Sequence, residues 1–191
     1  MKKRTDKGRA PADRRVRITP LGVVDDIAVS VAAAHIQMVF KLPVDVEPGL
    51  ECPEYTVLQA RCQYNAAGLV EFLAKGLTRH TLRLGLTGED ISLPFLTYVY
   101  GEAQIGGNAG VISTCRLGMT KKGAAVKKSK MYERLAKVSV HETGHLLGLL
   151  HCSRPECVMN FSVGLDHLDR LTLAFCSGCL GYLRETADLS G

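Results

Sequence analysis

The sequence predicts an α/β fold, in which a mixed twisted β-sheet is packed with helices. Stretches with helix-like and strand-like hydrophobic periodicity alternate in the first part of the chain. Hydrophobic residues make up 46% of the 191 residues, which is enough for a sizeable core. No internal repeat divides the chain. We therefore expect one domain at residues 15–191, preceded by a basic flexible tail at 1–14.

The first elements are marked by apolar periodicity and by capping residues. A strand is expected at 16–18, before a turn that contains proline and glycine. Asp25 and Asp26 can cap a helix that runs through about Phe40. This helix is apolar nearly all round, so we expect it to be buried. A short strand at 43–46 leads into a loop rich in proline and glycine.

The middle of the chain has one more helix and several strand signals. The helix is expected over Ala66–Lys75 and ends at Gly76, because glycine commonly terminates helices. Three strands follow, separated by turns that contain glycine, at 81–86, 95–100 and 111–117.

The last third is expected to be mostly helical. One helix begins at Ser129 or Lys130 and continues through Leu147, where Gly148 stops it. A final helix is expected from about Asp166 or Leu168 to Leu183, with an interruption near Gly178.

The positive charge is concentrated at the N-terminus. The net charge is +5, but residues 1–17 alone carry +6, so the rest of the chain is close to −1. A second cluster lies in a stretch expected to be an exposed loop: Lys121, Lys122, Lys127, Lys128 and Lys130. Solvated surface explains both clusters, and weak affinity for a polyanion is the alternative. We do not expect a nucleic-acid partner.

We expect a cytoplasmic protein with no membrane partner. The basic start is not followed by an apolar segment of the secretory kind. The most apolar stretch, 27–40, is interrupted by polar residues and is too short to span a bilayer. In a cytosolic protein, seven cysteines indicate metal ligands or buried thiols more often than disulfides.

The most informative motif combines three histidines, a glutamate and a glycine. His141 and His145 are four residues apart, so on a helix they share one face, about 5–6 Å apart at Cβ. Gly148 can end that helix with a positive φ and turn the chain, which brings His151 back toward the same ion. Three histidines leave the fourth zinc position open for water, which is the catalytic pattern. Glu142 can activate this water without ligating the metal.

This pattern, H-E-x-x-H-x-x-G-x-x-H, resembles the motif of the metzincin zinc peptidases. The residues around and after it resemble the archaemetzincin family more specifically: His151-Cys152, Cys157-Val158-Met159 and Cys176-Ser177-Gly178-Cys179. The stretch 98–103, Tyr-Val-Tyr-Gly-Glu-Ala, is also similar, though less specific. The resemblance implies a single metzincin-like catalytic domain with an active-site helix.

Four cysteines form a candidate structural zinc site. Cys152 and Cys157 are five residues apart, and Cys176 and Cys179 have the C-x-x-C spacing that suits tetrahedral thiolate ligation. Such an ion would tie the loop after the third histidine to the C-terminal helix, and the resemblance implies this zinc too. Disulfides or free thiols are the alternatives, and His167 is the one credible substitute ligand.

Other cysteines and the residues after the motif complete the site predictions. Cys52, Cys62 and Cys115 have no matching spacing and are expected to be buried thiols. The resemblance implies that Met159 forms a turn beneath the metal. Some metzincins have a tyrosine near this turn, but here Asn160 and Phe161 follow the methionine. Oxyanion stabilisation would then depend on zinc or on another residue.

The function predicted is a zinc-dependent metallopeptidase that hydrolyses peptide bonds by a zinc-bound water activated by Glu142. It would be a monomer with two Zn²⁺ ions, one catalytic and one structural, and a peptide or protein substrate. Metzincin-like enzymes hold substrate along an edge strand, which here would include parts of Glu102–Ile105 or Val111–Thr114. The alternative is a non-catalytic zinc-binding protein that binds peptide or polyanion. A gluzincin-type site with a distant glutamate ligand is a weaker possibility.

Overall fold

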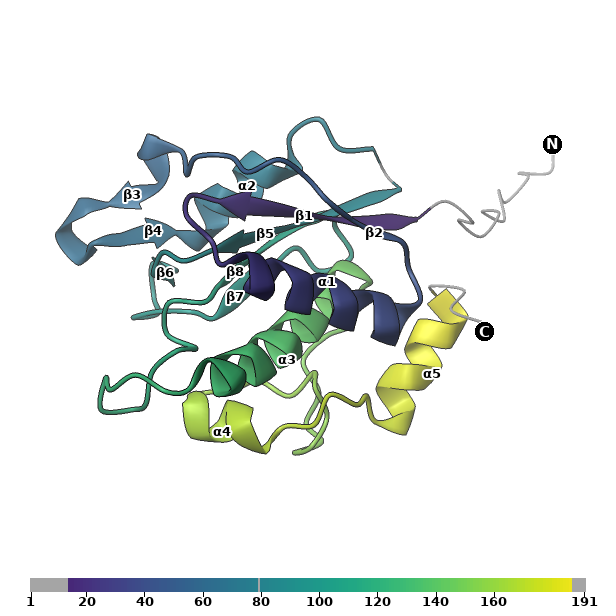
Figure 1. Ribbon diagram of the computed structural model, residues 1–191. Coiled ribbons are helices and arrows are strands. Elements are labelled where there is room, and N and C mark those ends of the chain that lie inside the picture. Colours follow the sequence, from purple (N-terminus) through teal and green to yellow (C-terminus); the bar gives the residue numbers. More distant parts are fainter. Residues whose placement is uncertain (1–13, 79, 187–191) are drawn as a thin grey trace.

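The computed structural model describes residues 14–78 and 80–186, in an architecture that mixes helices and strands (Figure 1). The α-helices of this part of the chain are α1 (Asp26–Phe40), α2 (Ala66–Ala74), α3 (Lys128–Leu146), α4 (Leu165–Arg170) and α5 (Ser177–Thr186). Its strands are β1 (Arg15–Leu21), β2 (Val44–Val46), β3 (Val57–Leu58), β4 (Gln63–Asn65), β5 (Thr81–Thr87), β6 (Ile91–Ser92), β7 (Gly101–Ala103) and β8 (Ala109–Ser113). Short 3₁₀ turns, Glu54–Thr56 and Gln59–Arg61, flank β3.

The main sheet has the strand order β2-β1-β5-β8-β7. Neighbouring strands are parallel except for β7, which pairs antiparallel with β8 and lies at the edge. A second, smaller sheet contains β3, β4 and β6. The mixed α/β fold predicted from the sequence is therefore confirmed.

Helices cover both faces of the main sheet (Figure 1). On one face, Val16 and Ile18 of β1 belong to the larger core cluster, together with buried residues of α1 and α3. On the other face, Leu21 of the same strand belongs to a second cluster with Leu69 and Leu73 of α2. The alternation along β1 follows from the two-residue period of a strand, and it buries both faces of the sheet.

Helix α1 begins at the predicted cap but is not buried all round. The Asp25 side chain accepts a hydrogen bond from the Ile27 N–H at 3.0 Å, as an N-cap residue should. One face of the helix packs in the core, whereas Ile27 and Met38 on the other face are more than half exposed. The apolar sequence therefore predicted too much burial for this helix.

The segment 95–100 was predicted as a strand, but it forms a loop of turns and bends. Pro94 cannot donate a backbone hydrogen bond, and Leu96 N bonds back to Leu93 O, as in a turn. Val99 N bonds to Ile91 O and Tyr100 O accepts from Ser113 N, so the loop has isolated contacts instead of a strand ladder. Residues 96–100 instead line the cavity described below, whereas Phe95 is almost fully exposed. Strand β8 also ends early, at Ser113, because the hydroxyl of this residue accepts the Cys115 N–H and begins a turn.

The final helix predicted from the sequence is two helices, α4 and α5. The break lies at 171–176, and Gly178, where an interruption was expected, is inside α5. The connecting residues pair with the loop at 156–158 through Thr172 N to Glu156 O and Val158 N to Ala174 O. These long-range contacts stop the helix, and periodicity could not reveal them.

Two further expectations concern the chain ends and membranes. The predicted tail at 1–14 lies outside the described residues except for Arg14. In the part of the chain that the structure covers, no helix combines the length and apolarity needed to cross a bilayer.

Candidate active site

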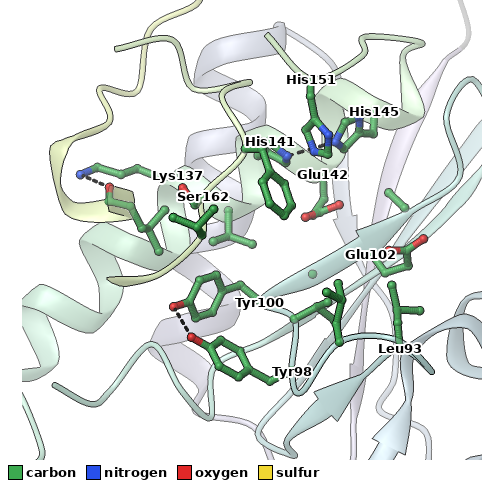
Figure 2. A pocket seen from close by; sticks show the side chains of 18 of the residues that line it. Leu93, Tyr98, Tyr100, Glu102, Lys137, His141, Glu142, His145, His151 and Ser162 are labelled. Carbon is green, nitrogen blue, oxygen red and sulfur yellow. Dashed lines mark hydrogen bonds between the residues drawn. The ribbon is translucent and has the colours of Figure 1, made fainter. Parts of the chain in front are cut away.

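Helix α3 and the turn at its end bring the three predicted histidines together (Figure 2). The helix ends in a Schellman motif, in which Leu149 N bonds to Gly144 O and Gly148 N bonds to His145 O, both at 2.9 Å. Gly148 has φ 95°, a conformation that L-residues adopt at a cost. The chain turns there, and His151 returns to face the two helix histidines.

Hydrogen bonds fix the tautomers of both helix histidines. Nδ1 of His141 lies 2.7 Å from Val158 O, and Nδ1 of His145 lies 2.7 Å from Leu149 O. A carbonyl oxygen only accepts, so each Nδ1 must carry the proton and donate it. Each Nε2 is then left with a lone pair for a metal ion, which is the usual arrangement of histidine ligands.

The ligand atoms converge as a zinc site requires. One nitrogen from each of the three histidines lies within 4.8 Å of the others, and the two Nε2 atoms of His141 and His145 are 3.0 Å apart. Tetrahedral ligation at a Zn–N distance of about 2.0–2.1 Å implies nitrogens about 3.3 Å apart. Without an ion, two lone pairs at this distance would repel. Burial lowers the pKa of His141 to about 4, so the imidazole is neutral and ready to ligate.

Glu142 lies beside the histidines and inside the same cavity. Figure 2 shows its carboxyl group between the histidine rings and strand β7. The residue is only 6% exposed, and burial raises the pKa of its carboxyl well above the ordinary value, with a smaller contribution from the charge of Glu102. A raised pKa suits a group that must take up a proton during catalysis.

The cavity has a volume of about 440 Å³ and mostly apolar walls. Tyr98 and Tyr100 from the loop before β7 form one side, and Leu168 and Leu171 from the α4 region form another. The phenol oxygens of Tyr98 and Tyr100 lie 3.5 Å apart. A cavity of this size accommodates a substrate side chain next to the histidines.

Strand β7 is the edge strand that borders this cavity, and Gly101, Glu102 and Ala103 all line it. Part of the predicted substrate strand, Glu102–Ile105, therefore lies where a peptide could pair. The other candidate, Val111–Thr114, was wrong. It belongs largely to β8, which is buried between β5 and β7 and has no free edge.

Met159 packs directly beneath the histidine helix. It is fully buried, and its Sδ atom would lie 2.6 Å from a Cβ built at Gly144, which stands between the two helix histidines. Its carbonyl oxygen accepts the Cys152 N–H at 2.8 Å. The methionine thus touches the helix without being placed as a ligand.

Two contacts near the site were not predicted. Phe161 packs edge-on against the His151 ring, with centroids 5.0 Å apart. Asn160 donates from Nδ2 to Cys152 O at 2.7 Å, which fixes the loop after the third histidine. The sequence drew attention to both residues only because neither is the tyrosine that some metzincins have near this turn.

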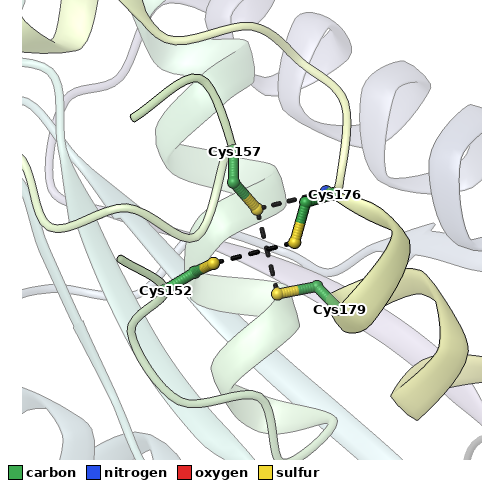
Figure 3. Close-up of side chains that lie close together, drawn as sticks. All are labelled: Cys152, Cys157, Cys176 and Cys179. Atoms are coloured by element: carbon green, nitrogen blue, oxygen red, sulfur yellow. Dashed lines mark hydrogen bonds between the residues drawn. The ribbon is translucent and has the colours of Figure 1, made fainter. Parts of the chain in front are cut away.

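The four predicted cysteines also converge (Figure 3). Sγ of Cys152 lies 3.7 Å from Sγ of Cys176, and Sγ of Cys157 lies 3.8 Å from Sγ of Cys179. Tetrahedral ligation with a Zn–S distance of about 2.3 Å implies sulfurs about 3.8 Å apart. The backbone N–H of Cys179 lowers the pKa of the Cys176 thiol to about 7, which favours the thiolate that metals bind.

The remaining cysteines and His167 take no part in either site. All seven cysteines are free thiols, so the disulfide alternative has no support. Cys52 and Cys115 are half-buried, whereas Cys62 is exposed, contrary to the prediction of a buried thiol. His167 lies in α4 and belongs to neither of the two ligand groups found among the described residues.

The chain is similar to known proteins over most of its length. The model of a family described as peptidase family M54 matches residues 27–185. An archaemetzincin from Archaeoglobus fulgidus is 34% identical over 171 residues, which cover 89% of this chain and 99% of that protein. An archaemetzincin from Methanocaldococcus jannaschii is 32% identical over 171 residues, covering 90% of this chain and 93% of the relative.

Solved structures show the same fold. The crystal structure of the Archaeoglobus fulgidus archaemetzincin complexed with malonate has a TM-score of 0.77 and 33% identity, covering 88% of this chain and 99% of that one. That of the Methanopyrus kandleri archaemetzincin has a TM-score of 0.80 and 28% identity, covering 93% and 97%.

Fold, histidine helix and relatives together define a zinc metallopeptidase, an enzyme that hydrolyses peptide bonds. More specifically, the chain belongs to peptidase family M54, the archaemetzincins. The family resemblance and the enzyme class predicted from the sequence are confirmed. The alternative of a non-catalytic zinc-binding protein finds no support in these relatives.

Proposed function

We propose that His141, His145 and His151 bind the catalytic zinc ion and that Glu142 is the general base. The observation that carries this proposal is the convergence of three imidazoles, two of them oriented by carbonyl oxygens, beside a buried carboxyl group. A zinc ion bound there would lower the pKa of a water molecule and polarise the scissile carbonyl. These residues fit that ion because their neutral nitrogens lie at zinc-ligand spacing.

The protein's own groups then carry the proton and hold the peptide. Glu142 accepts a proton from the attacking water and returns it to the leaving amine. The open edge of β7 pairs with a substrate in extended conformation, and the cavity beside it receives one substrate side chain. Gly148 and Met159 support the ligands, one by turning the chain and the other by packing beneath the helix.

A second zinc ion bound by Cys152, Cys157, Cys176 and Cys179 would be structural. Four thiolates leave no open position for water. This ion would join the loop that follows His151 to the start of α5, so it would brace the third catalytic ligand. Sulfur spacings of 3.7 and 3.8 Å support this assignment.

The cellular setting is part of the same proposal. We place the catalytic domain at 15–191 and the protein in the cytoplasm, where thiols stay reduced and available to a metal. A monomer without a nucleic-acid partner fits the surface charges. In the second lysine cluster, Lys121 pairs with Asp166, Lys128 with Asp25, and Lys130 with Glu133 and Asp169, which weakens the field that a polyanion would meet.

The test is a digest of a library of unstructured peptides with zinc-loaded protein. Wild type should cleave, and Glu142→Gln should keep its zinc while cleavage falls by roughly 10²–10⁴-fold, because general-base catalysis contributes about that much. Glu89→Gln, a change outside the site, is the control and should cleave like wild type. Equal cleavage by Glu142→Gln and wild type would refute the general-base assignment.

A further inference from the structure

The edge strand begins with a glycine that lies directly against the proposed general base. A Cβ atom built at Gly101 would be 2.6 Å from Oε1 of Glu142 and 2.7 Å from both Cδ and Cγ. Carbon atoms in van der Waals contact are about 3.5–4.0 Å apart, so these separations are impossible for real atoms. The side chain of Glu142 therefore occupies the space that any residue other than glycine would fill at position 101.

The backbone does not need glycine at this position. The glycines with positive φ in the described chain are Gly22, Gly76, Gly106, Gly123 and Gly148, and Gly101 is not among them. Alanine could adopt the same strand conformation and keep the pairing of residue 101 with Ile112. The requirement for glycine therefore arises from the space taken by Glu142 rather than from a turn.

The Glu142 carboxyl group is closely packed between neighbouring elements. No hydrogen bond reaches it from the residues drawn in Figure 2. It lies between α3 and β7, and it is nearly buried. The space left by the missing side chain of Gly101 is therefore part of the volume that holds its oxygens.

We propose that Gly101 is a positioning residue for Glu142: its missing side chain lets the carboxyl group lie against the edge strand, where the substrate peptide pairs. This inference rests on the proposed role of Glu142 as general base. A Cβ at 101 would push the carboxyl group off the strand and change its distance to the reacting water. Misplacement by about 1 Å can reduce a rate by about 10²-fold.

The clash with alanine would be relieved by the side chain rather than by the fold. The atoms that a Cβ would meet, from Cγ to Oε1, all belong to the Glu142 side chain, which can change its rotamer. Gly110, on the neighbouring strand, differs in this respect. A Cβ there would meet the Cβ of Ala103 at 2.9 Å and the backbone oxygen of Glu102 at 3.1 Å, so alanine would strain the hairpin itself.

These two glycines provide a matched pair for the kinetic experiment. Zinc-loaded Gly101→Ala should retain its metal and a KM close to that of wild type, while kcat falls roughly 10–100-fold. Gly110→Ala should lose thermal stability, and its kcat below the melting transition should fall less than that of Gly101→Ala. An unchanged kcat in Gly101→Ala, or a smaller loss than in Gly110→Ala, would overturn the proposal.

Thermal unfolding tests the contact without any need for turnover. Gly101→Ala should lower Tm more with Glu142 present than in the Glu142→Ala background, where the space is empty. Gly181→Ala, at a glycine with no atom within 4 Å of a built Cβ, should shift Tm equally in both backgrounds. A wild type that cleaves no peptide would overturn the proposed function, whereas equal Tm shifts for Gly101→Ala would overturn the positioning contact.

Discussion

Gly148 offers a sharp test of how the third histidine reaches the site. In Gly148→Ala, an L-residue would have to adopt φ near 95°. The left-handed region costs such residues about 1–2 kcal/mol. The new Cβ would also lie 2.7 Å from the Tyr182 Oη atom, but this tyrosine is 41% exposed and can move at little cost. We therefore expect the backbone to account for most of the destabilisation.

This free energy converts into two measurable changes. In a chain of this length about 1–2 kcal/mol lowers Tm by roughly 2–8 °C. If the turn relaxes instead, it moves His151 and the Leu149 carbonyl that orients His145. The zinc affinity would then fall by roughly 5–30-fold for the same free energy. Thermal unfolding of the metal-free protein and competition with a chromogenic chelator measure the two effects.

Two further variants identify the cause. Asparagine tolerates the left-handed region better than alanine, so Gly148→Asn should lie between wild type and Gly148→Ala in both measurements. In the Gly148→Ala background, Tyr182→Phe removes the hydroxyl that the new Cβ would meet. It should restore little of the lost Tm or zinc affinity, because the backbone strain remains. If Gly148→Ala has the Tm and zinc affinity of wild type, or if Tyr182→Phe restores both, the role given to the backbone turn is refuted.

Two more predictions concern the scaffold. Met159→Ala should lower the free energy of unfolding by about 2–5 kcal/mol because the side chain is fully buried, whereas Met159→Leu should cost less than about 1.5 kcal/mol. Urea unfolding measures both variants. A negligible effect of alanine would contradict the packing of Met159 beneath α3. Hydrogen bonds from Lys128, Tyr132 and the Ile27 backbone lower the pKa of Asp25 from 3.8 to about 2. The charged form therefore stabilises the fold above about pH 4, and this stabilisation is lost as the pH falls toward 2. The difference in Tm between wild type and Asp25→Asn should shrink over that window, and a constant difference would argue against the ionic contacts.

The features predicted from the sequence depend on residues that are close together in the chain. The spacing of His141 and His145 acts within one helix, and Gly148 acts within one turn of its end, so local geometry determines both. Each of the two cysteine pairs is also local. Periodicity likewise located α1 and α3 to within a residue or two, as far as helix boundaries can be defined.

The features that were missed depend on contacts between distant parts of the chain. Glu142 and Gly101 are far apart in sequence, and nothing near Gly101 indicates that the Glu142 side chain fills the space where a side chain of residue 101 would lie. The apolar run at 95–100 could form a strand or line a cavity, and only the folded structure distinguishes the two. Val158 and Leu149 contribute carbonyl oxygens to the histidines, a role that any residue type could fill.

The most direct test of the central claim is the number of zinc ions bound per chain, measured by elemental mass spectrometry after dialysis. Wild type should carry two. His151→Ala and Cys176→Ser should each carry one, because they remove ligands from different ions, while the controls His35→Ala and Cys115→Ser should keep two. A single zinc in wild type, or two zinc ions retained in His151→Ala, would contradict a catalytic ion held by three histidines beside a separate four-cysteine site.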